Sequence, residues 1–179
     1  LLAKAHCMGV SCMVEPQNPF ANKELSTEER IVLRAEREAN IETERNGGIP
    51  TKKCLISLRK AYEDAGNDFK AAETLEQQNE IYPNPEDYNL IGVYYHNSGN
   101  KDKAIDFFER ALDHNPNNYW PNFNLGNTLF YKDSKRSRQY LNKAYELNPS
   151  EPCINILLGR LDKREGKEAE AKEKFQIAY

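Results

Sequence analysis

Glycine and proline recur in this chain with a nearly fixed period. Gly92, Gly126 and Gly159 stand 34 and 33 residues apart, and Pro116 and Pro149 follow the first two glycines at matching places. A unit of this length cannot bury its apolar face alone, so several units must stack and share a continuous core. The period therefore restricts the chain to a stacked array. It also directs the search for function to an extended surface rather than to a catalytic pocket.

Apolar residues of matching size return with the same period. The copy at 85–118 has the order Tyr88, Ile91, Gly92, Tyr95, Gly99, Ala104, Phe108, Ala111 and Pro116. The copy at 119–151, one residue shorter in its middle loop, keeps Leu125, Gly126, Leu129, Leu141, Ala144 and Pro149. The copy at 152–179 is incomplete and keeps Leu158, Gly159, Gly166, Ala171, Phe175 and Ala178. A degenerate copy at 52–84 has Arg59 and Gln78 at the glycine and alanine positions.

Each copy is predicted to form two helices, because its apolar residues recur three and four positions apart. In the copy at 85–118 the predicted helices are Asp87–Asn97 and Lys101–His114. Gly99 and Gly166 are expected to end first helices in a left-handed conformation. Pro116 is expected to end a second helix and to set the turn into the next copy.

Small residues are expected where the two helices of a copy cross. Gly92 with Ala104, and Gly126 with Ser137, are predicted to allow close approach of the two backbones. Phe108 is expected to fill the gap toward the next helix pair. A large side chain at Gly126 would then overpack the crossing.

The order of residues in these copies resembles the tetratricopeptide repeat family, over residues 52–179. The resemblance implies an all-α fold, a right-handed solenoid of antiparallel helix pairs. It also implies a concave face that binds peptides or partner proteins, without enzymatic activity and without a cofactor. Family members that grip chaperone tails use a set of lysine, arginine and asparagine positions of which only Asn124 is matched here, so that ligand is disfavoured.

The resemblance places a defined set of side chains on the concave face. The predicted partner-binding groove consists of Asn89, His96, Trp120, Phe123, Asn124, Asn127, Tyr131, Arg160 and Arg164. Phe130 is expected beside them, so that four aromatic residues would face solvent unless a partner covers them. The asparagines suit an extended peptide backbone, because each amide both donates and accepts. The arginines favour an acidic partner.

Purely structural roles are the alternative for these residues. Trp120 precedes Pro121 and could plug a repeat junction, and Phe130 could pack under the shortened loop at 132–134. The asparagines could be solvated surface.

The first 51 residues differ from the repeats. Residues 1–25 have no period and are predicted to form an irregular arm, whereas residues 26–51 are predicted to form one charged helix. Ser26 and Glu29 have the spacing of a capping box. This helix either covers the exposed side of the first repeat or docks on a partner.

The arm itself leaves several alternatives open. Its start, Leu1–Ala5, could be the tail of an export signal or an ordinary loop. The compartment is therefore unknown: the expected soluble protein is cytoplasmic, or organellar or exported after processing. A zinc site at His6, Cys7 and Cys12 is disfavoured, because a fourth ligand at compact spacing is missing.

Composition excludes several classes of function. The chain of 179 residues has a net charge of −3, which argues against a nucleic-acid coat, and a mean hydropathy of −0.86. It contains no apolar run that approaches the roughly 20 residues of a membrane span. A basic run could contact phosphate, RNA or an acidic partner, or could simply be solvated; it comprises Lys132, Lys135, Arg136 and Arg138. We find no catalytic constellation, so neither an enzyme nor a metal site is expected.

Two functions remain from the sequence. In the first, the chain is a non-catalytic scaffold or adaptor that binds a partner peptide or protein through its concave groove. In the second, it is a permanent accessory or assembly subunit of a large complex, anchored by its N-terminal arm.

Overall fold

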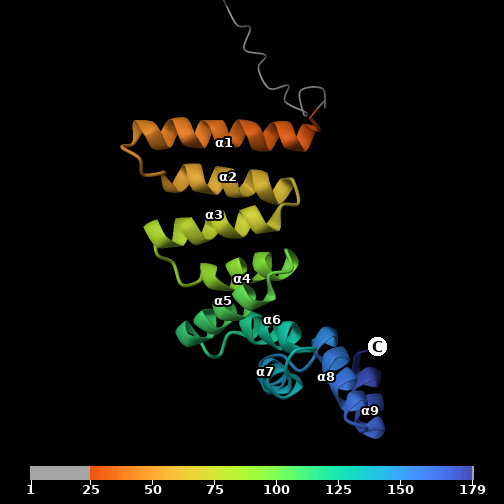
Figure 1. The fold of residues 1–179 in the computed structure, drawn as a ribbon. Helices are drawn as coiled ribbons and strands as arrows, with labels where there is room; N and C mark the ends of the chain where they lie inside the picture. Colours follow the sequence, from red (N-terminus) through yellow and green to blue (C-terminus); the bar gives the residue numbers. More distant parts are fainter. Residues whose placement is uncertain (1–24, 179) are drawn as a thin grey trace, which may run out of the picture.

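The computed structural model describes residues 25–178, and all regular structure in this range is helical. Consecutive helices pack against one another as sequential pairs (Figure 1). The helices are α1 (Thr27–Arg45), α2 (Lys52–Asp64), α3 (Asp68–Ile81), α4 (Asp87–Asn97), α5 (Lys101–His114), α6 (Tyr119–Leu129), α7 (Ser134–Leu147), α8 (Pro152–Arg164) and α9 (Glu168–Ala178). The predicted all-α array of helix pairs is confirmed. The division into arm, N-terminal helix and four repeats stays a prediction, and residues 1–24 lie outside the described part of the chain.

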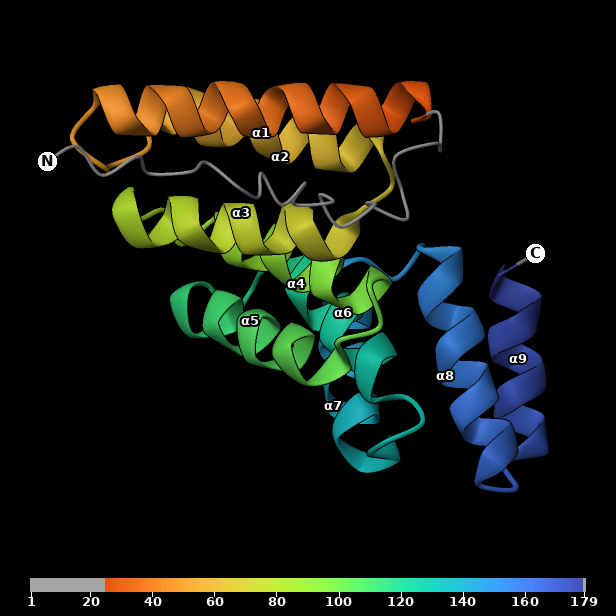
Figure 2. The same cartoon turned by 45° about the horizontal axis from the view of Figure 1, so that its top comes forward.

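The array turns along its length. Each helix contacts the next one in the sequence, and α4 also contacts α6. Figures 1 and 2 both show α8 and α9 at a steep angle to α1 and α2. This rotation brings the first helices α4 and α6 side by side, and together they make one surface.

Helix ends follow the signals in the sequence. The predicted helices Asp87–Asn97 and Lys101–His114 are confirmed as α4 and α5. Gly99 and Gly166 have φ values of 85° and 77°, as predicted for residues that end a first helix. Asn100, directly after Gly99, then caps α5 by accepting a hydrogen bond from the N–H of Lys103.

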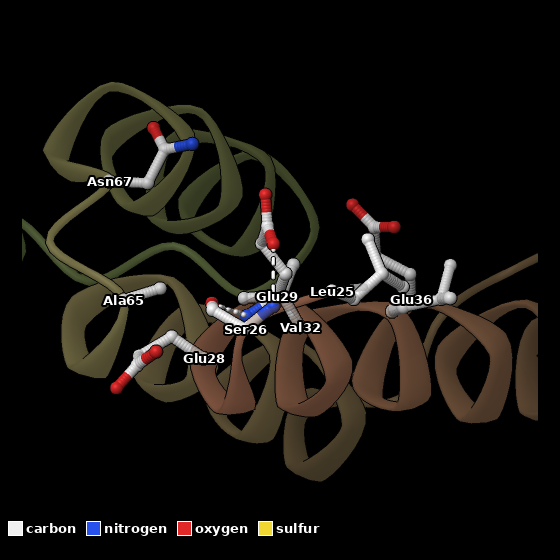
Figure 3. A pocket seen from close by; sticks show the side chains of 9 residues that line it. Leu25, Ser26, Glu28, Glu29, Val32, Glu36, Ala65 and Asn67 are labelled. Atoms are coloured by element: carbon white, nitrogen blue, oxygen red, sulfur yellow. Dashed lines mark hydrogen bonds between the residues drawn. The ribbon is translucent and has the colours of Figure 1, made fainter. Parts of the chain in front are cut away.

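The predicted capping box at the start of α1 is confirmed. The Ser26 N–H donates to the Glu29 carboxylate over 2.7 Å, and the Glu29 N–H donates to Ser26 Oγ over 3.1 Å (Figure 3). The helix covers one side of α2: Ala39 is buried, and the Tyr62 hydroxyl donates to the Glu36 carboxylate over 2.6 Å.

Glycine sets the close approach of the two helices within a pair. A Cβ atom added to Gly126 would lie 2.7 Å from Leu141 Cγ and 3.2 Å from the Leu141 backbone nitrogen. A Cβ atom added to Gly92 or Gly159 would meet the ring of Phe108 or Phe175 at 2.5 and 2.8 Å. These aromatic rings therefore lie on the glycine of their own pair. Phe108 also borders the next pair, but it leaves part of the gap that it is expected to fill open, because it lines a depression together with residues of α6.

Two clusters of buried side chains form the core. The first extends from α2 to α6 and includes Tyr62, Leu75, Tyr95, Phe107 and Leu125. The second joins the end of α6 to α7 and α8 and includes Phe130, Leu141, Ile154, Leu158 and Leu161. Buried Tyr95 donates its hydroxyl hydrogen to Glu76 and accepts from Lys103, which ties α3, α4 and α5 together.

Replacement of Gly126 by leucine is expected to destabilise the protein. The new side chain would collide with Leu141 and its backbone, and overpacking of this kind costs about 1–3 kcal/mol. Urea unfolding of the Gly126→Leu variant should show a lower midpoint than the wild type. The control is Gln139→Leu, which places the same side chain on the exposed face of α7. Equal midpoints for both variants would contradict the close approach.

Candidate binding groove

Two hydrogen bonds join α4 to α6 on the surface made by first helices. The Asn124 side-chain N–H donates to Asn89 Oδ1 over 3.1 Å. Further along both helices, His96 Nδ1 lies 2.9 Å from Thr128 Oγ1. Four of the predicted groove residues lie on these two helices within this small region, namely Asn89, His96, Asn124 and Asn127. The structure thus brings this part of the predicted set together.

A depression of about 200 Å³ opens between the two helices. We call it the α4–α6 groove; it is lined by Val93, His96, Asn97, Phe108, Asn124 and Asn127. The side-chain amides of Asn97 and Asn127 form no hydrogen bond with any residue that the structure describes. Each of these amides can therefore donate to and accept from a ligand.

The tautomer of His96 follows from its partner. The Thr128 hydroxyl donates to the carbonyl oxygen of Asn124 over 2.7 Å, so Thr128 Oγ1 is left to accept from His96 Nδ1–H. His96 Nε2 is then an unprotonated acceptor. Burial, with a smaller effect of the Lys101 charge, lowers the pKa of His96 below its usual value. The groove therefore holds a neutral imidazole at neutral pH.

The aromatic residues divide into exposed and buried ones. Trp120 and Tyr131 are 58% and 78% exposed, as expected for groove residues. Phe123 is partly buried and stacks on Tyr119 with ring centroids 6.0 Å apart. The expectation that Phe130 faces solvent is wrong: it is only 4% exposed, because α8 packs over the end of α6.

The basic end of the predicted groove is partly occupied by internal contacts. Arg164 donates to the carbonyl oxygen of Phe130 over 2.8 Å, and its guanidinium lies 5.3 Å from the Phe130 ring centroid. Arg160 is exposed on α8. Of the two predicted arginines, Arg164 therefore fastens α8 to the end of α6, which reduces its availability to an acidic ligand.

Comparison with known proteins agrees with this architecture. The tetratricopeptide repeat profile matches residues 85–118, the segment that forms α4 and α5. Residues 85–118 form a tetratricopeptide repeat, and the helix pairs on either side follow the same helix–turn–helix plan.

Solved structures of MamA have a similar fold. A crystal structure of MamA has a TM-score of 0.68 and 18% sequence identity, over 87% of this chain and 94% of that chain. The segment of MamA from residue 41 to its end, from Desulfovibrio magneticus RS-1, has a TM-score of 0.65 and 18% identity, over 84% of this chain and 90% of that one. This similarity shows the fold, and a fold of tetratricopeptide repeats indicates protein partners.

The basic run around the α6–α7 loop is engaged in ion pairs between repeats. Lys132 pairs with Asp102, and Arg136 pairs with Glu109. Arg138 reaches the next repeat, where it contacts Asp162 at 2.8 Å and Glu165 at 3.0 Å. Three of the four basic side chains therefore form ion pairs with neighbouring helices. These contacts argue against a nucleic-acid-binding role for the basic run, and also against a run that is simply solvated.

Two structural asparagines were missed in the sequence. The Asn122 amide donates to the carbonyl oxygens of Pro116 and Asn118 over 3.0 and 2.8 Å. Asn155 donates to Pro149 and Glu151 over 3.2 and 3.3 Å. Each asparagine secures the turn that enters its helix pair. The two asparagines are separated by one period of the sequence, and this equivalence could have predicted their shared role.

Metal-ligating side chains are scattered over the described helices. Within residues 25–178, no group of three or more His, Cys, Asp and Glu side chains is arranged to hold a metal ion. His6, Cys7 and Cys12 lie outside the described residues. The described helices also include none that is both long and apolar enough to cross a bilayer.

Loss of Arg138 is expected to cost more than loss of Lys132. Asp162 is 5% exposed, so Arg138→Ala would leave a buried carboxylate without its cation, at a cost of about 2 kcal/mol. Lys132 and Asp102 are both largely exposed, so Lys132→Ala should cost at most about 1 kcal/mol. Urea unfolding of both variants measures the difference. A larger loss for Lys132→Ala would contradict a structural role for Arg138.

The free energy of unfolding should depend on the titration of His96. Because folding lowers the pKa of His96, the unfolded chain takes up the proton first as the pH falls below about 6.5. The contribution of neutral His96 to stability is full above that pH, and it declines until the folded-state pKa is reached. Denaturant unfolding at several pH values should show that His96→Gln reduces this decline, whereas His114→Gln, at an exposed site, retains it. If the free energy of unfolding depended on pH in the same way for both variants, His96 would not be the source of the decline.

Proposed function

We propose that this tetratricopeptide repeat protein is a non-catalytic scaffold that binds an extended segment of a partner protein in the α4–α6 groove. The observation that carries the proposal is the pair of unengaged amides, Asn97 and Asn127, at the border of a depression. An extended peptide has one N–H and one C=O group per residue, and side-chain amides match this alternation.

The groove is held open by its own structure. The hydrogen bonds of Asn124 to Asn89 and of His96 to Thr128 fix the spacing of α4 and α6 without using Asn97 or Asn127. A preformed site loses little conformational entropy when it binds. The neutral His96 adds an acceptor for a donor group of the ligand. We therefore propose that the groove contacts the backbone of the peptide and so accepts many ligand sequences.

A second function is supported by a different surface. A depression of about 690 Å³ lies on α8 and α9, and Ala171 and Phe175 contribute apolar lining. A permanent subunit of a larger complex would use an apolar surface of this kind to pack against its neighbours. The arm proposed as its anchor lies outside the described residues.

Removal of the two free amides should weaken peptide binding without changing stability. We would select ligands for the full chain from a random peptide library and measure their dissociation constants by fluorescence anisotropy. For Asn97→Ala combined with Asn127→Ala, we expect at least about a fivefold loss of affinity, since each lost hydrogen bond contributes about 0.5–1.5 kcal/mol.

The matched control removes two amides from an exposed second helix. Gln139→Ala with Asn142→Ala, on α7, should leave the dissociation constants unchanged. Equal binding by both double variants would exclude the α4–α6 groove. A library that yields no ligand for the wild type would contradict the scaffold function itself.

A further inference from the structure

A second depression lies on the other side of the Asn89–Asn124 hydrogen bond. It has a volume of about 240 Å³ and lies where the first turns of α4 and α6 meet the last turn of α5. Its lining includes Glu86, Asn89, Ala111, His114 and Trp120. Asn89 lines this depression and Asn124 lines the α4–α6 groove, so the two hollows adjoin.

The Trp120 side chain is exposed, and it packs against another aromatic ring. Its side chain contacts Tyr119 edge-on, with ring centroids 4.9 Å apart, and Tyr119 stacks in turn on Phe123. The backbone N–H of Trp120 donates to Asn118 Oδ1 over 3.2 Å. These contacts hold the indole in place while Trp120 stays 58% exposed. The ring therefore offers a large, preorganised surface for a ligand.

Glu86 supplies an uncommitted negative charge to the depression that Trp120 also lines. It is the N-cap residue of α4, yet its side chain makes no capping hydrogen bond. No hydrogen bond or ion pair joins its exposed carboxylate to any residue between 25 and 178. The only basic side chain among the described lining residues is His114. The carboxylate is therefore available to a positive charge.

We propose that this depression receives a lysine or arginine side chain of the partner. The aliphatic stem would lie along Trp120, and the charged head would be attracted both by the ring face and by Glu86. Cations are attracted to the faces of indole rings, and tryptophan is the best aromatic residue for this contact. We call the site the Trp120–Glu86 pocket.

The proposal changes the expected charge of the ligand. Arg160 and Arg164 suggest an acidic partner from the sequence, but Arg164 is held by the Phe130 carbonyl oxygen. Glu86, in contrast, forms no ion pair with any described residue, and His114 is the only basic side chain that lines its depression. The inference rests on the proposed function, because it names the chemistry that a groove ligand must carry next to its backbone contacts.

Tryptophan fluorescence tests the pocket directly, because Trp120 is the single tryptophan of the chain. We would titrate the full chain with N-acetyl-arginine amide and, at equal ionic strength, with N-acetyl-glutamate amide. The arginine derivative should give a saturable change in emission, and the glutamate derivative should give none. In Glu86→Gln the affinity for the arginine derivative should fall about threefold or more. The affinity that is left would come from the contact with the indole ring.

The control variant removes a carboxylate elsewhere. Glu44→Gln, at an exposed position on α1, should retain the wild-type affinity. Equal responses to both amino-acid derivatives, or an unchanged affinity in Glu86→Gln, would overturn the pocket.

The peptide library separates this inference from the groove function. Peptides selected by the wild type should be enriched in lysine or arginine at one position, and those selected by Glu86→Gln should not. Selected peptides without such enrichment would overturn the pocket and leave the groove function intact. A response to the arginine derivative without any selected peptide would support the pocket and contradict the groove function.

Discussion

The close approach of two helices at a glycine is the contact on which this structure depends. In each of three pairs a large side chain of the second helix lies on a glycine of the first: Phe108 on Gly92, Leu141 on Gly126 and Phe175 on Gly159. Interiors packed at crystal-like density leave no room for another methyl group there. The spacing within a pair is therefore set locally, and the next first helix packs against the surface that the pair creates.

Polar contacts between helix pairs engage several of the charged and amide side chains near the middle of the array. Arg138 bridges α7 to Asp162 and Glu165 on the following pair, and Arg164 fastens α8 to the end of α6. Asn122 and Asn155 secure the turns at which repeats begin. These groups stabilise the array rather than recognise a partner. What remains uncommitted on α4 and α6 is a smaller set that is neutral or acidic, and this favours a ligand with a polar backbone and a basic side chain.

The α4–α6 groove and the Trp120–Glu86 pocket would recognise different parts of one ligand. The α4–α6 groove presents amides and a neutral imidazole, which suit a peptide backbone of any sequence. The Trp120–Glu86 pocket presents an indole face and a carboxylate, which suit one kind of side chain. The hydrogen bond between Asn89 and Asn124 separates them and holds both helices in register. Backbone contacts would then supply affinity, and one pocket would supply selectivity.

The sequence by itself determined the period, the all-α array, the limits of α4 and α5, and the capping box of α1. All of these depend on residues within one repeat, where helical spacing, glycine and capping side chains act over a few positions. Only the tertiary structure decided that Phe130 is buried, that the basic run forms ion pairs, and that Glu86 and Trp120 line one depression. These outcomes join residues that are tens of positions apart, and they depend on the rotation of each pair relative to the next. That rotation arises from the summed packing of many side chains, which no single motif in the sequence records.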